Sequence, residues 1–244
     1  MENSRIFVTM NAVFRDEEKC RLAMEKIVKD AHAAFGVDSH FWFRSRDGKS
    51  LFVLEQYKNK KALGKAIRRF TFARISFFRS IKVTDVTVYG IVSNGIKLMF
   101  ALLGSRYMDF YRDYSKDAVE SKQSGIQNFE RNRIFIATNA RFESEEEGEL
   151  AIKAGVGSAH SESAAKTHFW CRSKDRKAFF LLEQYDDEQA LIKHDMANPG
   201  ARADFFESIA GGDATVYGSE SDQVKEMLAP LNPTYMSYYG GYSK

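Results

Sequence analysis

The sequence predicts an α+β protein built from two similar units in tandem. The stretch "HFWFRSRDGKSLFVLEQY" begins at His40, and "HFWCRSKDRKAFFLLEQY" begins at His168. A shift of 128 residues aligns 5–116 with 133–244 without a gap, and about 50 of the 112 paired positions are identical. Chance does not produce such a match, so the chain is a tandem duplication of one unit.

Each unit is expected to contain the same order of strands and helices, because alternating apolar residues indicate strands and capping residues indicate helix starts. The elements predicted for the second unit are a strand over 133–142, a helix over 144–165, strands over 167–173 and 178–185, a helix over 186–210 interrupted near Pro199, and a strand over 213–218. A short helix and a last strand-like segment follow. This β-α-β-β-α-β order is that of a ferredoxin-like unit.

A four-stranded antiparallel sheet of this kind has helices on one face only, so its other face must be covered. The strands "LFVLEQY" (51–57) and "FFLLEQY" (179–185) are apolar on both alternating faces, which indicates that both faces are buried. We therefore expect the sheets of the two units to pair within one chain. The predicted boundaries are 1–116 for the first repeat, 117–132 for a polar linker and 133–244 for the second repeat.

The composition favours a folded, soluble protein in the cytoplasm. Hydrophobic residues make up 44% of the chain, and the N-terminus shows no export signal. Only Cys20 and Cys171 occur, at non-equivalent positions, so a disulfide framework is not expected. The first repeat carries a net charge of +11 and the second −6. A nucleic-acid motif is missing, so attraction between the two halves explains the charges better than nucleic-acid binding.

The segment "LLEQYDDEQALIKHDMANPGARADFF" (181–206) resembles the antibiotic biosynthesis monooxygenase-like (ABM) family of the dimeric α+β barrel superfamily. The resemblance implies a tandem-duplicated, intramolecular version of a barrel that other members build as homodimers. Many members oxidise small aromatic or quinol-like substrates with O₂ and use no metal or flavin, whereas others degrade haem or have no known activity.

The haem-degrading branch is disfavoured by the residues themselves. The resemblance places Asn139 at that branch's Asn position, but His194 and Asp204 stand where it has Trp and His. An axial iron ligand is then missing. The histidines also lack familiar metal-ligand spacing, so the sequence predicts neither a metal nor another cofactor.

His194 is the candidate catalytic base, because oxidation by O₂ requires the substrate as its anion and histidine can take up a proton near neutral pH. The alternative is a solvated helix residue beside Asp195. Asn139 is the second catalytic candidate, since an amide in mid-strand suggests a hydrogen-bonding role to a substrate oxygen or to neighbouring backbone. The first repeat has Ala66 in place of His194, so the predicted site lies mainly in the second repeat.

Four further residues are candidates for substrate binding: Trp170, His168, Glu183 and Tyr185. Trp170 and His168 share one strand face and could line a pocket for a flat ligand or serve only in the core. Glu183 lies among apolar neighbours, so it should either move a proton or pair with an arginine, such as Arg172, as Glu55 should with Arg44. Tyr185 could border a cavity or cap its strand.

Two functions follow from these residues. The first is a cofactor-independent monooxygenase that oxidises a small aromatic or quinol-type substrate with O₂. The alternative is a non-catalytic, ligand-binding or stress-associated barrel, because one fold hosts many functions. The expected partner is a small aromatic or apolar ligand, without nucleic acid or membrane, and the expected state is a monomeric pseudo-dimer, with further homo-oligomerisation left open.

Overall fold

The computed structural model describes residues 5–32, 37–68, 72–101, 103–115, 133–161, 164–173, 175–197, 200–218 and 221–243. The described residues within 1–108 and 238–244 form one compact unit, and those within 109–237 form the other. The predicted linker over 117–132 lies outside the described residues. No helix within the described ranges is both long and apolar enough to cross a membrane.

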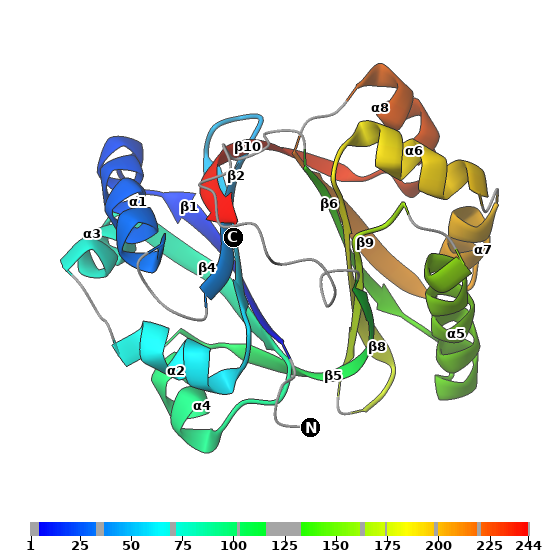
Figure 1. Ribbon diagram of the computed structural model, residues 1–244, viewed down its shortest axis with the longest axis horizontal. Helices are drawn as coiled ribbons and strands as arrows, with labels where there is room; N and C mark the ends of the chain where they lie inside the picture. Colours follow the sequence, from blue (N-terminus) through cyan, green and yellow to red (C-terminus); the bar gives the residue numbers. More distant parts are fainter. Residues whose placement is uncertain are drawn as a thin grey trace. The chain divides into compact units, whose positions relative to one another are not determined.

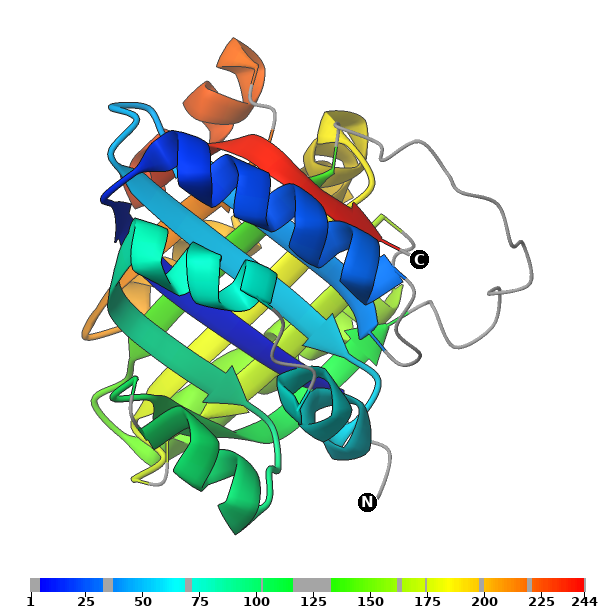
Figure 2. The ribbon, with the colours of Figure 1, turned by 90° about the vertical axis from the view of Figure 1, so that its left-hand side faces the viewer.

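The first unit is an antiparallel sheet with helices on one face (Figures 1 and 2). Its elements are β1 (Ile6–Phe14), α1 (Glu17–His32), β2 (Val37–Ser45), β3 (Ser50–Tyr57), α2 (Lys60–Arg68), α3 (Phe72–Ser80), β4 (Ile81–Tyr89), α4 (Asn94–Ala101) and the start of β5 (Arg106–Ser115). Strand β1 lies between β3 and β4, β2 pairs with β3, and the start of β5 runs parallel to β4. Apolar residues of β1, β3 and β4 pack against α1, α2 and α3 to form the core.

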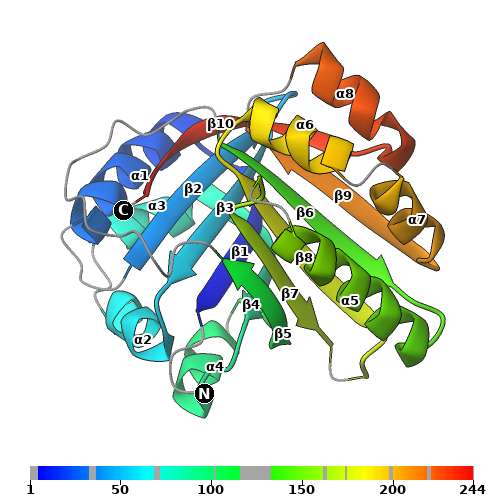
Figure 3. The ribbon, with the colours of Figure 1, turned by 45° about the vertical axis from the view of Figure 1, so that its right-hand side comes forward.

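The second unit repeats this order. Its elements are the end of β5, β6 (Ile134–Arg141), α5 (Glu145–Ser161), β7 (Thr167–Arg172), β8 (Ala178–Tyr185), α6 (Glu188–Ala197), α7 (Ala201–Glu207), β9 (Gly211–Tyr217), α8 (Asp222–Leu228), a 3-10 turn (Ala229–Leu231) and the start of β10 (Thr234–Ser243). Strand β6 lies between β8 and β9, and β7 pairs with β8. Figure 3 shows α5, α6 and α7 on one face of this sheet.

The hydrogen-bonded strand order is closed: β1-β3-β2-β10-β9-β6-β8-β7-β5-β4. This confirms the expectation of a mixed α and β chain with a barrel made from a single polypeptide. Strand β5 takes part in both sheets, since Thr87–Tyr89 of β4 pair with its first residues and Arg172 of β7 pairs with Asp109. The sequence predicted the two last strands but not this sharing.

The helix predicted over 186–210, with an interruption near Pro199, is two helices in the structure, as that interruption indicated. Helix α6 ends at Ala197 and α7 begins at Ala201, after Gly200 with a φ of 84°. The left-handed conformation suits glycine and cannot continue a right-handed helix. The break matters for the site, because α6 carries His194 and α7 carries Arg202.

Candidate functional site

A cavity of about 810 Å³ lies between the sheet and the helices of the second unit. Strands β7 and β8 line it with His168, Trp170, Leu181 and Glu183, since alternate residues of a strand point to the same face. Helices α6 and α7 add His194 and Arg202. Three of the four residues predicted to bind substrate therefore line this cavity, whereas Tyr185 is not among its described lining residues.

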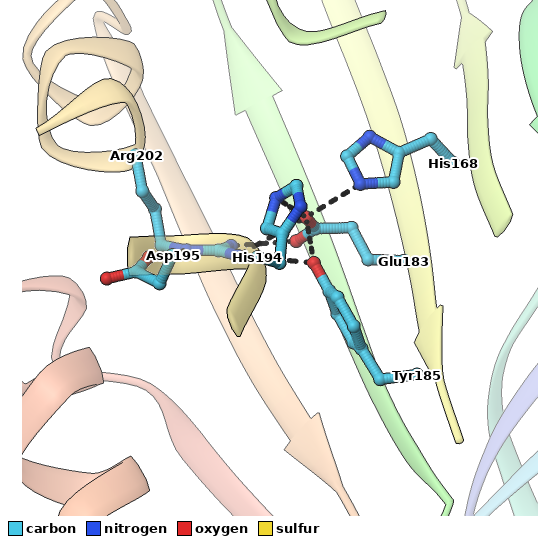
Figure 4. Close-up of polar contacts among 6 residues, drawn as sticks. All are labelled: His168, Glu183, Tyr185, His194, Asp195 and Arg202. Atoms are coloured by element: carbon cyan, nitrogen blue, oxygen red, sulfur yellow. Dashed lines mark hydrogen bonds and ion pairs between the residues drawn. The ribbon is translucent and has the colours of Figure 1, made fainter. Parts of the chain in front are cut away.

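A buried ion pair forms the polar centre of this cavity (Figure 4). Arg202 Nη1 donates to Glu183 Oε2 at 2.8 Å, and Nη2 donates to Oε1 at 3.4 Å. Glu183 is 2% exposed. Burial acts to raise the pKa of this carboxyl group, but Arg202 and His168 outweigh burial and leave the pKa below its usual value. The carboxylate therefore stays ionised and compensated.

Tyr185 and Asp195 extend this pair into a network. The Tyr185 hydroxyl donates to Glu183 Oε1 at 2.9 Å, and Arg202 Nε donates to Asp195 Oδ1 at 3.2 Å. Burial, followed by the charge of Glu183, raises the pKa of Tyr185 well above its usual value. The phenol therefore remains protonated and serves as a donor to the carboxylate.

The two histidines stand next to the same carboxylate oxygen. His168 Nε2 lies 3.3 Å and His194 Nε2 lies 3.8 Å from Glu183 Oε1, and the two rings are 5.2 Å apart, centre to centre. Burial, followed by the charge of Arg202, lowers the pKa of His194 to about 4. At neutral pH the His194 ring is neutral and can accept a proton.

His168, Glu183 and His194 have ligand atoms within 4.8 Å of one another, an arrangement that could hold a metal ion. Imidazole and carboxylate are common zinc and iron ligands. Both carboxylate oxygens, however, already bond the Arg202 guanidinium. A metal ion would have to displace this cation or bind beside it.

Two buried polar atoms of the cavity wall have no hydrogen-bond partner among the described residues. They are Trp170 Nε1 and Thr138 Oγ1, on side chains that are 2% and 1% exposed. A buried donor without a partner costs about 1–3 kcal/mol. A ligand with an oxygen at this wall would remove that cost.

The structure separates Asn139 from the other candidates. Its side chain is exposed and donates to Asp213 Oδ1 at 2.9 Å on the neighbouring strand. Strand alternation explains this, because Thr138 lines the cavity and the next residue points to the opposite face. The prediction that Asn139 acts with His194 was wrong in its geometry.

The arginine partners expected for the buried glutamates were also wrong. Arg172 Nη1 lies 3.4 Å from Glu149 Oε1, and Arg44 Nη2 lies 2.9 Å from Glu17 Oε2. Their side chains leave the sheet toward the first helix of each unit. The partner of Glu183 is Arg202, which the sequence analysis did not name. The alignment of the two repeats did contain a signal for it, because an arginine, Arg74, also occupies the equivalent position of the first repeat.

The prediction for His194 had two alternatives, and the structure rules out the solvated one, while the role as a base stays a prediction. The residue is 8% exposed and lines the cavity, so it is not a solvated helix residue. The first unit lacks this group, because Ala66 occupies the equivalent position. The first unit does repeat the contacts of the buried glutamate with histidine and tyrosine. His40 Nδ1 lies 3.2 Å from Glu55 Oε1, and the Tyr57 hydroxyl donates to Glu55 at 2.6 Å.

Comparison with solved structures finds similar folds. A candidate monooxygenase from Fusobacterium nucleatum subsp. nucleatum matches with a TM-score of 0.60 and 16% identity, over 88% of this chain and 91% of that one. A candidate monooxygenase from Lactobacillus acidophilus matches with a TM-score of 0.53 and 14% identity, over 86% and 91%. The likeness is one of fold. No family model and no curated protein sequence matches the chain.

Proposed function

We propose that the second unit is a cofactor-independent oxygenase of the ABM type, acting on a small hydroxylated aromatic or quinol with O₂. The observation that carries this proposal is the neutral His194 in a cavity of about 810 Å³ walled by Trp170 and Phe205. Folds of this kind occur in candidate monooxygenases. The cavity volume lies in the range of small-molecule sites.

The reaction begins with proton transfer. The substrate hydroxyl gives its proton to the His194 ring, and the resulting anion gives one electron to O₂. The two radicals combine at a ring carbon, and the peroxide takes the proton back from His194. Loss of water from the hydroperoxide then leaves a carbonyl. For a 1-naphthol, the sum is naphthol plus O₂ giving 1,4-naphthoquinone plus water.

The surrounding residues position this base and the substrate. The Glu183–Arg202 pair lies next to the His194 ring, and its carboxylate oxygen is 3.8 Å from Nε2. This carboxylate can stabilise the ring when it becomes protonated. Trp170 and Phe205, with ring centres 5.7 Å apart, provide flat surfaces for an aromatic substrate.

The test is oxygen uptake with a panel of naphthols and hydroquinones, corrected for autoxidation. We expect His194→Ala, which installs the residue type of the first repeat, to lower kcat by about 10²-fold or more. Lys193→Ala, at the exposed neighbouring position, should keep the wild-type rate. With ¹⁸O₂, one labelled oxygen should enter the quinone. Equal, background-level rates in all three proteins would contradict the proposal.

A binding-only function is the second candidate, and the low pKa of His194 favours it. A base with a pKa of about 4 has a weak driving force for taking a proton from a phenol. In that case, naphthols should quench tryptophan fluorescence with the same saturation in Trp42→Phe and in Trp42→Phe/His194→Ala, where Trp170 is the remaining tryptophan, while no oxygen is consumed.

A further inference from the structure

The first unit contains a cavity of its own, of about 640 Å³. Its interior is formed by apolar side chains of the sheet and of α1, α3 and α4. They include Val8, Val53, Ile27, Phe77, Phe100 and Leu103. The position that carries His194 in the second unit is Ala66 here. The cavity therefore has the size and surface of a small-molecule site but not the proposed base.

Three cations border this cavity. Arg15 follows β1, Arg79 lies in the last turn of α3 and Lys82 is the second residue of β4, and all three side chains are exposed. The Arg15 amide donates to the Ser80 carbonyl at 2.8 Å, which holds the end of β1 against the α3–β4 junction. Within the described part of the chain, none of the three forms an ion pair with an acidic side chain.

The interior acid does not cancel these charges. Glu55 is the one acidic residue among the described residues lining this cavity, and Arg74 lines it as well. Glu55 already accepts the Tyr57 hydroxyl and stands 3.2 Å from His40. Arg15, Arg79 and Lys82 consequently leave a positive border around an apolar interior.

The equivalent positions of the second repeat have the opposite character. Arg15 corresponds to Glu143, and Arg79 corresponds to Glu207. The described acids lining the second cavity are Glu147, Glu183, Asp195 and Asp204, and its one described arginine or lysine is Arg202. The tandem units thus present cavities of similar build with charges of opposite sign at their borders.

We propose that the cavity of the first unit binds an organic anion with an apolar body, such as an aromatic or aliphatic carboxylate, without converting it. The apolar body fills the space between sheet and helices, and the anionic head stays at the border near Arg15, Arg79 and Lys82. The positive charges at the border favour an anionic ligand, because electrostatic complementarity gives specificity. The second cavity, with its acidic border, disfavours the same anion.

The test uses a pair of fluorescent probes with similar aromatic bodies in the full chain. Anilinonaphthalene sulfonate is anionic, and N-phenyl-1-naphthylamine is neutral. The variant R15E/R79E gives the border the acidic residue types of the second repeat. The control K26E/K61E makes the same change in net charge at exposed positions that are not among the described lining residues.

We expect R15E/R79E to weaken sulfonate binding by about tenfold or more at low salt, because two attractive charges become repulsive. The neutral probe should bind R15E/R79E within about twofold of wild type, because neither substitution changes the apolar interior of the cavity. Decanoate and 1-naphthoate should both displace the sulfonate. The carboxylate that competes more strongly shows whether the cavity prefers an aliphatic or an aromatic body. Equal sulfonate affinities in R15E/R79E and K26E/K61E, or no saturable binding to the wild type, would overturn the proposal.

Discussion

At the residue scale, the stability of the site depends on the Glu183–Arg202 pair. The side chains are 2% and 13% exposed, so neither charge is well hydrated. We expect Arg202→Met to lower the free energy of unfolding by about 3–5 kcal/mol, because it leaves an uncompensated buried carboxylate. Urea unfolding at pH 7 measures this change.

The double variant Arg202→Met/Glu183→Gln should recover part of the loss, since it removes both charges. The control is Lys225→Ala, which breaks an exposed pair with Asp222 at 3.3 Å and should cost less than about 1 kcal/mol. An equal loss in Arg202→Met and Lys225→Ala would show that the buried pair has no special role.

His194 should make the stability depend on pH. Its pKa of about 4 in the folded state lies below the ordinary value of 6.5, so the unfolded chain binds the proton more readily. The stability from the neutral ring is therefore complete above about pH 6.5 and is lost as pH falls toward 4. In this window we expect the free energy of unfolding to fall by up to about 1.4 kcal/mol per pH unit from this residue.

His194→Gln should remove this part of the slope, because glutamine does not titrate. Urea unfolding of both proteins between pH 7 and 4.5 compares the slopes. Burial also lowers the pKa of His40, so a smaller slope should remain in the variant. If the free energy of unfolding fell equally with pH in the two proteins, this would contradict a pKa of about 4 for His194.

Sequence reasoning at this scale identified the residues that strand alternation controls. His168 and Trp170 line the cavity on the strand face that their spacing indicated, whereas Asn139 lies on the opposite face of the sheet. Arg202 was missed because its partner is 19 residues away, across a helix break. Alternation assigns a face but not a partner on another element.

At the element scale, strands β4 and β9 are each followed by a glycine whose position does not tolerate a side chain. Gly218 follows β9 with a φ of 115°, and a Cβ there would lie 2.3 Å from the Arg133 carbonyl oxygen. The equivalent Gly90 follows β4 with a φ of 110°. A side chain at this position suffers from both the conformation and the contact.

We expect Gly218→Ala to destabilise the protein by about 2 kcal/mol or more. Gly64→Ala is the matched control in α2, where a Cβ would meet nothing within 4 Å, and it should stabilise the helix by about 0.5–1 kcal/mol. Thermal unfolding of both variants tests the pair. A raised melting temperature for Gly218→Ala would disprove the argument.

The elements themselves were largely predictable. Ser144 and three glutamates marked the start of α5, and the Pro199–Gly200 pair marked the break before α7. Strand β5 was expected as a last strand, but its pairing partners were not. Local patterns define an element, whereas the edge that it joins depends on residues far away in the sequence.

At the scale of the whole molecule, the closed strand order bears on self-association. In the closed strand order, each of the described strands has a hydrogen-bonded neighbour on both sides, so none of them offers an open edge for pairing with a second chain. We expect sedimentation to give a monomer of 27.9 kDa from micromolar to high micromolar concentrations. A concentration-dependent dimer would show that another surface mediates association.

The sequence by itself determined the duplication, the element order, the opposite charges of the repeats and the absence of a His194 equivalent in the first. These features follow from residue identities and from periodicity along the chain, so no contact needs to be known. Only the tertiary structure decided that Arg202 neutralises Glu183, that Asn139 faces away from the cavity, and that Arg15 and Arg79 border the same cavity. Such facts depend on which distant segments meet, and the packing of the whole core selects them.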